Sequence, residues 1–146
     1  MAVDAGADYP LGTERPDAVR TPGGLALDEL TLDALRAGRL DAAEMRATAA
    51  TLHLQAEVAH RAGRTQLAAN LDRAAELTAL PDELILEIYT ALRPHRSTED
   101  ELERWADRLE RDFLAPLTAT FVREAKAVYA ERRLLSADGR AGTPPV

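Results

Sequence analysis

The sequence contains no cysteine among its 146 residues. This absence excludes a disulfide-stapled scaffold, a thiolate metal site and a cysteine nucleophile. No run of about eighteen apolar residues occurs, so we expect no membrane-spanning helix and no membrane partner. The first ten residues are acidic and lack an apolar run. We therefore expect no secretory signal and a cytoplasmic location.

Positive charge is also in short supply. The 18 Lys and Arg residues face 25 Asp and Glu residues, which gives a net charge of −7. A protein that binds the phosphate backbone needs clustered Lys and Arg, so we expect no nucleic-acid partner. Aromatic residues make up only 4% of the chain, and runs of β-branched residues are absent. Ala, Leu, Arg and Glu dominate instead, and these strong helix formers predict an all-α fold.

Proline and glycine divide the chain into three parts. Residues 1–47 are predicted to form an irregular, proline-rich N-terminal arm with short helical turns, because each proline blocks a helix. Thr31 is expected to cap one short helix, which Gly38 ends, and the spacing of Asp41 and Glu44 predicts a second. Tyr9, Pro10 and Leu11 are the candidate contacts of this arm with another surface. Residues 136–146 are predicted to form a disordered tail.

Residues 48–135 are predicted to form a helical body, an open up-and-down bundle. The first helix of the body begins near Thr48 and meets a C-terminal cap at Gly63. A later helix has Pro81 in its first turn. Thr98 with Glu101 predicts a capping box at the start of the next helix, and Ser97 with Asp100 offers an alternative register. Pro116 then breaks or kinks the chain, and the sequence leaves both outcomes open.

Apolar residues cover more of these helices than one buried face requires. Leu117, Phe121, Val128 and Leu135 are expected to form the buried stripe of the last helix. Four further residues lie off the main stripes of their helices: Leu54, Val58, Leu86 and Tyr89. We interpret these extra positions as contacts with a partner chain.

Chemistry-bearing residues are few. His53, Glu57 and His60 share one helical face, which fits a metal site in spacing alone. A solvated polar face is the favoured interpretation, because no further ligand or supporting shell is evident. We therefore predict no catalytic, cofactor-binding or metal-binding residue in this chain. Arg93 and Arg96 flank a proline at a helix junction and are candidate anchors for a neighbouring chain.

Several blocks of the sequence carry a family resemblance that extends over roughly Asp8 to Leu135. They are Asp8 to Leu11, Thr31-Leu32, Met45-Arg46, Thr51-Leu52, Leu54 to Ala56, Ala62 to Arg64, Arg73 to Ala79, Pro81-Asp82, Ile85 to Tyr89, Ala91 to Pro94, Arg96-Ser97, and Phe121 to Ala125 with Tyr129 and Arg132. The chain resembles the small (gamma) subunit of adenosylcobalamin-dependent diol and glycerol dehydratases. Arg123, in the last block, joins the candidate partner contacts.

The resemblance implies a bacterial hydro-lyase, a hexamer with two copies each of a large (alpha), a medium (beta) and a small subunit. In that family a radical mechanism converts propane-1,2-diol or glycerol to the aldehyde plus water. Adenosylcobalamin is held by the larger subunits, and the small subunit is all-α and supplies no catalytic residue. Only eight residues precede Tyr9, so the sequence does not support microcompartment targeting through this chain. The alternative is a free-standing helical adaptor or regulatory protein.

Overall fold

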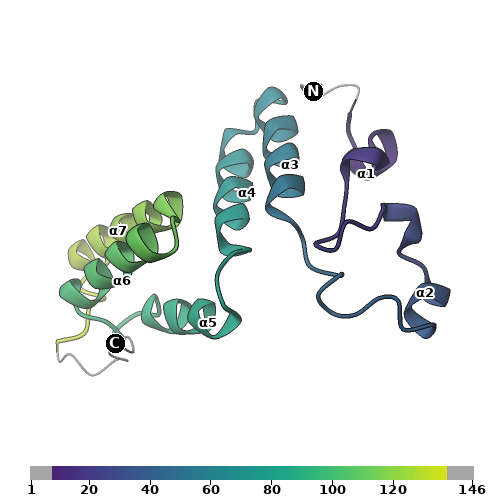
Figure 1. Ribbon diagram of the computed structural model, residues 1–146. Coiled ribbons are helices and arrows are strands. Elements are labelled where there is room, and N and C mark those ends of the chain that lie inside the picture. Colours follow the sequence, from purple (N-terminus) through teal and green to yellow (C-terminus); the bar gives the residue numbers. More distant parts are fainter. Residues whose placement is uncertain (1–7, 138–146) are drawn as a thin grey trace. The chain divides into compact units, whose positions relative to one another are not determined.

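The computed structural model describes residues 8–137, and all regular structure in that range is helical apart from one isolated β-bridge between Arg20 and Ala26 (Figure 1). This confirms the all-α prediction. The chain divides into two compact units, residues Met1–Thr78 and Ala79–Val146. None of the helices in the described range is long and apolar enough to cross a membrane.

The arm of the first unit consists of short helical pieces joined by turns. Thr31 caps one of them, accepting a hydrogen bond from the Ala34 N–H at 3.1 Å, and Gly38 follows that helix with φ +70°. Both features match the sequence prediction. The pieces are α1 (Leu11–Glu14), the 3₁₀ helices at Pro16–Ala18 and Leu27–Glu29, and α2 (Leu32–Arg36).

The second short helix of the arm, predicted at Asp41 and Glu44, does not form. Asp41 Oδ1 does accept hydrogen bonds from the N–H groups of Ala43 and Glu44, but the backbone continues as turns. The Glu44 carboxylate accepts a hydrogen bond from the Gly23 N–H at 3.3 Å instead of reaching back to the cap. Its side chain therefore links two parts of the arm, and the capping box is incomplete.

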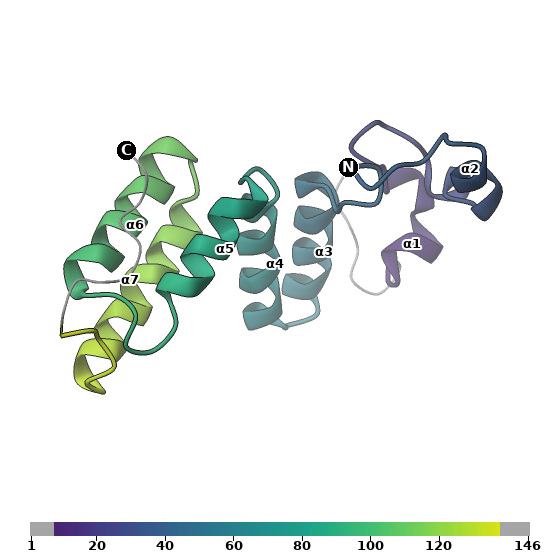
Figure 2. The same ribbon diagram turned by 90° about the horizontal axis from the view of Figure 1, so that it is seen from below.

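Two antiparallel helices complete the first unit, α3 (Ala49–Arg61) and α4 (Thr65–Leu77) (Figure 2). α3 begins where the sequence predicts, with Thr48 as its N-cap, and Gly63 follows its end with φ +74°. Small side chains on the facing sides let the two backbones approach closely. The core between them consists of Ala56, Ala59 and Ala68, with Leu71 packed against it.

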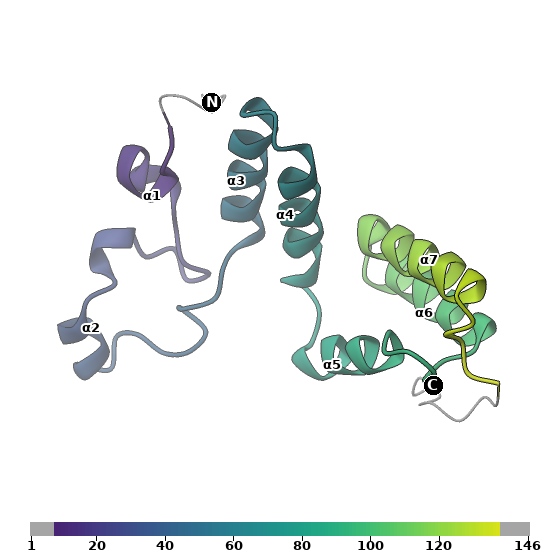
Figure 3. The same ribbon diagram turned by 180° about the vertical axis from the view of Figure 1, so that it is seen from behind.

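The second unit begins with α5 (Asp82–Ala91), and Pro81 lies one position before it rather than inside its first turn. α6 (Glu99–Asp112) and α7 (Pro116–Glu131) then form an antiparallel hairpin (Figure 3). Thr98 and Glu101 make the predicted capping box at the start of α6. Pro116 is the first residue of α7, so it separates two helices rather than kinking one.

The division into arm, body and tail stays a prediction. By its internal contacts, the chain places α3 and α4 in one unit with the arm, and it places α5, α6 and α7 in the other unit. The first seven residues of the predicted arm and residues 138–146 of the predicted tail lie outside the described residues.

Candidate partner-binding surface

The arm is held against α3 by a small apolar cluster. Leu11 and Val58 are both buried at its centre, and Val19 and Leu54 pack against them. Leu54 and Val58 were expected to face a partner chain. The structure corrects this expectation, because the chain's own arm covers that face of α3. Leu11, a predicted partner contact, is 6% exposed and thus mainly an internal residue.

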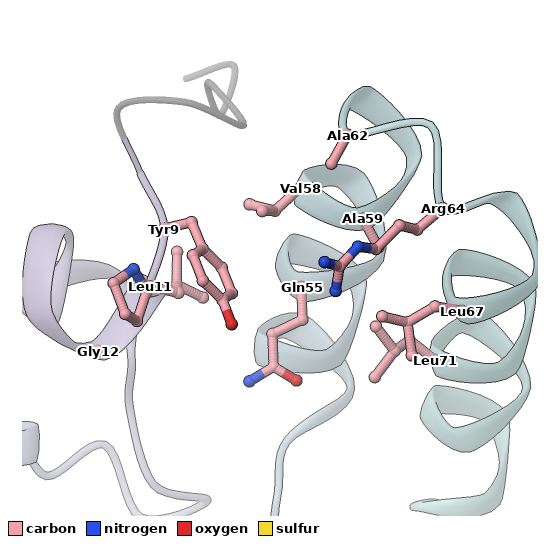
Figure 4. Close-up of a pocket in the computed structure, with 11 residues that line it drawn as sticks. Tyr9, Leu11, Gly12, Gln55, Val58, Ala59, Ala62, Arg64, Leu67 and Leu71 are labelled. Carbon is pink, nitrogen blue, oxygen red and sulfur yellow. The ribbon is translucent and has the colours of Figure 1, made fainter.

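A pocket of about 460 Å³ lies beside this cluster, between the start of the arm and the α3–α4 hairpin. Figure 4 shows the Tyr9 ring, the Gln55 amide and the Arg64 guanidinium around it, with Leu67 and Leu71 on α4. The other lining residues are Pro10, Leu11, Gly12, Val58, Ala59 and Ala62. Tyr9 and Pro10 are exposed, as predicted partner contacts need to be. The walls of the pocket are mainly apolar and include one guanidinium, that of Arg64.

The predicted contacts Arg93 and Arg96 lie in the loop between α5 and α6. The segment that follows α7 holds this loop through backbone hydrogen bonds. The His95 N–H donates to the Leu134 carbonyl at 2.7 Å, and the Ser136 N–H donates to the Ser97 carbonyl at 2.8 Å. Both arginines are exposed.

Two side chains hold the same loop from within. The Tyr129 hydroxyl donates to the Leu92 carbonyl, and the buried Ser97 hydroxyl donates to the Ala91 carbonyl at 2.9 Å. The polar groups of both side chains find their partners inside the second unit. The hydrogen bonds therefore hold the loop in one conformation.

Arg123, the remaining predicted contact, is engaged within the chain. Its guanidinium on α7 bonds to three carboxylates on α6, Glu103 at 2.9 Å and Asp107 and Glu110 at 2.8 Å. These hydrogen bonds, with Glu103 contributing most, raise the pKa of Arg123. The Lys126 ammonium donates a hydrogen bond to the Glu103 carboxylate at 2.7 Å. This bond, and to a smaller extent the one from Arg123, lowers the pKa of the Glu103 carboxyl. Arg123 thus clasps two helices, and a contact with a partner stays a prediction.

Large apolar side chains are exposed on the second unit. On α5, Leu86 is 65% exposed and Tyr89 is 70% exposed, as the interpretation of extra apolar positions requires. On α7 the expected buried stripe is wrong. Leu117, Phe121 and Val128 are each at least 40% exposed, and the face packed inward carries smaller side chains. The buried residues of α7 are Thr118, Ala119 and Val122, and Ala115 is buried just before the helix.

The His53, Glu57 and His60 set is not assembled as a metal site. His53 Nδ1 lies 2.9 Å from Asp72 Oδ1 on α4, and Glu57 forms an ion pair with Arg61 at 2.6 Å. Within residues 8–137 no three His, Cys, Asp or Glu side chains lie close enough to hold a metal ion. The solvated polar face is the better description of these residues.

One cationic feature was not identified as a candidate contact from the sequence. Arg132 and Arg133 follow α7 and are exposed, and Arg133 has a left-handed φ of +56°. They lie next to Leu134, whose carbonyl binds the loop that carries Arg93 and Arg96. The adjacent arginine pair was visible in the sequence, but its proximity to that loop depends on how the end of α7 folds back.

Comparison with known proteins gives two consistent findings. A family model described as dehydratase small subunit matches residues 5–136. The propanediol dehydratase small subunit of Citrobacter freundii is 53% identical over 131 residues, which is 90% of this chain and 76% of the relative. The protein of that name from Salmonella typhimurium is 50% identical over 132 residues, with the same two shares.

Proposed function

Because the chain belongs to the dehydratase small-subunit family, we propose that it acts as the small subunit of a diol dehydratase, assembled with larger subunits. In our proposal the complex holds two copies each of a large, a medium and a small chain. The complex removes water from propane-1,2-diol or glycerol and releases the aldehyde. The two relatives are bacterial, and we place the assembly in the bacterial cytoplasm.

One observation supports assembly most strongly. α5 exposes Leu86 and Tyr89, which lie three residues apart and thus on one helical face. Scattered exposed apolar residues are normal, but a tyrosine and a leucine exposed side by side are typical of residues that bury on association. The same pair falls in a block that resembles the family.

We further propose that the chain is non-catalytic. Catalysis by acid and base needs carboxyls whose surroundings separate their pKa values, or a histidine placed in a cleft. His53 is instead paired with Asp72 at the surface, and Glu103 is held ionised by Lys126 and Arg123. In both arrangements the ionisable group is engaged within the chain, which supports a structural role for His53 and Glu103.

We also propose that this chain does not hold adenosylcobalamin. The pocket beside the arm has a volume of about 460 Å³, within the range for drug-sized ligands, and no histidine lines it. Adenosylcobalamin is much larger than such a ligand. We therefore assign the cofactor and the chemistry that it supplies to the larger subunits.

Reconstitution tests this proposal. The large and medium subunits are purified with and without this chain, and the rate of aldehyde formation from propane-1,2-diol is measured with added adenosylcobalamin. We expect the chain alone to be inactive and the three-chain complex to be active and soluble. Failure of the chain to bind the larger subunits would contradict the proposal and favour a free-standing adaptor.

A control separates a structural role from a catalytic one. Variants of the ionisable residues that a catalytic role would use, His53→Ala and Glu57→Gln, are each assembled into the complex. We expect the turnover rate of either complex to stay within about twofold of wild type, because neither side chain acts in the reaction. A loss of a hundredfold or more would place catalysis in this chain.

A further inference from the structure

The second unit contains a group of arginines that have no ion-pair partner among residues 8–137, and we name this group the arginine corner. It comprises Arg93, Arg96, Arg132 and Arg133, all exposed. The backbone bond from His95 to Leu134 joins the loop of the first pair to the segment of the second. Four guanidinium groups thus share one end of the unit, where the C-termini of α5 and α7 meet.

Four other basic residues of the same unit, Arg108, Arg111, Arg123 and Lys126, are paired with acids, whereas Arg104 on α6 has no ion-pair partner in the described part of the chain. Arg123 and Lys126 bond to Glu103, and Arg111 lies 3.7 Å from Asp107. In contrast, none of the arginine-corner side chains has a carboxylate within ion-pair distance among residues 8–137. In a chain of net charge −7, such a concentration of unpaired positive charge is an exception. Helix C-termini favour positive charge, which explains one cation at each end but not four.

The arginine corner continues the exposed face of α5. Leu86, Tyr89 and Arg93 are spaced i, i+3 and i+7, so they lie on one side of the helix and its first following turn. Tyrosine and arginine dominate the energetics of protein interfaces when they are buried together. The guanidinium also binds carboxylates through two parallel hydrogen bonds, which fixes orientation.

We propose that the outer face of α5 and the arginine corner form one docking surface for an acidic, partly apolar surface of a larger dehydratase subunit. This inference rests on the proposed function. Charge complementarity identifies the occupant: four unpaired guanidinium groups need carboxylates, and Leu86 with Tyr89 needs an apolar contact. The backbone bonds that fix the loop hold the surface ready before the partner binds, which lowers the ordering cost of association.

Charge reversal tests the docking surface. Arg93→Glu with Arg96→Glu is compared with wild type and with a control, Arg39→Glu with Arg104→Glu, which reverses two exposed arginines elsewhere. Each chain is titrated into the purified large and medium subunits, and the dissociation constant is measured at several salt concentrations. Circular dichroism checks that helical content is unchanged.

We expect the arginine-corner variant to bind at least about tenfold more weakly, with a smaller salt dependence, and the control to change by less than about threefold. The independent variant Arg132→Glu is expected to weaken binding in the same direction. Arg93→Lys with Arg96→Lys is expected to bind more weakly than wild type but more tightly than the glutamate variant, because the charge remains while the paired hydrogen bonds of the guanidinium are lost.

Three outcomes overturn the inference. If wild type binds the larger subunits and the arginine-corner variant binds equally well, the docking surface is wrong and the proposed function stands. If wild type does not bind them, the proposed function fails as well. Binding of each chain to heparin, a polyanion probe, is measured as well. If the arginine-corner variant binds the larger subunits as wild type does but binds heparin more weakly, the arginine corner recognises a polyanion and not a protein.

Discussion

Leu11 packs against Val58, and this contact joins the N-terminal arm to α3. Each side chain is 6% exposed, although the two residues are far apart in the sequence. Leu11 belongs to a helix of only 4 residues, which is too short to be stable alone. The arm is therefore ordered by burial against α3 rather than by its own helical propensity.

This contact gives a stability prediction. Leu11→Ala removes most of a buried side chain and leaves a space that the arm cannot fill completely, so the free energy of unfolding should fall by about 2–3 kcal/mol. Leu32→Ala is the matched control, since Leu32 is 70% exposed and should change stability by less than about 0.5 kcal/mol. Urea unfolding of the full chain measures both. Equal effects of the two substitutions would show that the arm does not pack as described.

The capping box of α6 gives a second prediction. Thr98 Oγ1 accepts a hydrogen bond from the Glu101 N–H at 3.3 Å, and Glu101 accepts one from the Thr98 N–H at 2.8 Å. Thr98→Ala should lower the unfolding free energy by about 1 kcal/mol, and Thr98→Ser should restore most of that loss. Thermal unfolding followed by circular dichroism distinguishes the three proteins. An alanine variant as stable as wild type would mean that the cap contributes nothing.

The clasp between α6 and α7 predicts a pH dependence. Lys126 and then Arg123 lower the pKa of Glu103 from 4.5, so the folded state favours its ionised form. The stabilisation is complete above the unfolded-state pKa near 4.5 and is lost as the pH falls through the lower folded-state value. Because the Glu103 side chain is partly exposed, this stabilisation amounts to at most about 1 kcal/mol at pH 7.

Glu103→Gln tests this dependence. The variant should be less stable than wild type at pH 7, and the difference should vanish well below pH 4. Glu124→Gln on the exposed side of α7 serves as the control and should change stability little at either pH. A difference for Glu103→Gln that stays constant across the acid range would contradict the lowered pKa.

The exposed face of α5 gives a prediction about assembly. Tyr89→Ala should leave the stability of the isolated chain within about 0.5 kcal/mol, because the ring is 70% exposed. Binding to the larger subunits should weaken by about tenfold or more, since a tyrosine that becomes buried on association is a typical hot spot. Calorimetric titration measures the affinity. Unchanged affinity would remove α5 from the interface.

Local signals in the sequence predicted most helix boundaries. Thr31 and Thr98 cap the helices that were predicted to begin there, and α3 begins next to Thr48 as expected. Gly38 and Gly63 follow the ends of α2 and α3. Pro116 was recognised as an interruption, although its spacing alone did not distinguish a break from a kink. Such signals act over one helical turn, so a single sequence reveals them.

The inward face of α7 was not predictable in the same way. Leu117, Phe121 and Val128 form a more apolar stripe than Ala115, Ala119 and Val122, yet the second set is the buried one. Small side chains allow close approach to α6, which carries the large residues Leu102, Trp105 and Leu109. Which face turns inward depends on the shape of the partner helix and not on the hydrophobicity of α7 alone.

The sequence revealed only some of the arginines that lie at the candidate partner surface. Arg93 and Arg96 were identified from the proline between them, a local feature. Arg132 and Arg133 were not identified as contacts, because only the bond between His95 and Leu134 brings them close to the same loop. The internal clasp of Arg123 was missed for the same reason, since its three carboxylates lie on another helix.

The central claim is that this chain works as a subunit of a larger assembly. Native mass spectrometry tests it most directly, on the tagged chain recovered from its own cells grown with propane-1,2-diol or glycerol. We predict a complex with two larger chains, each chain present in two copies, that carries bound cobalamin. A lone monomer, or an assembly made of this chain only, would contradict the account.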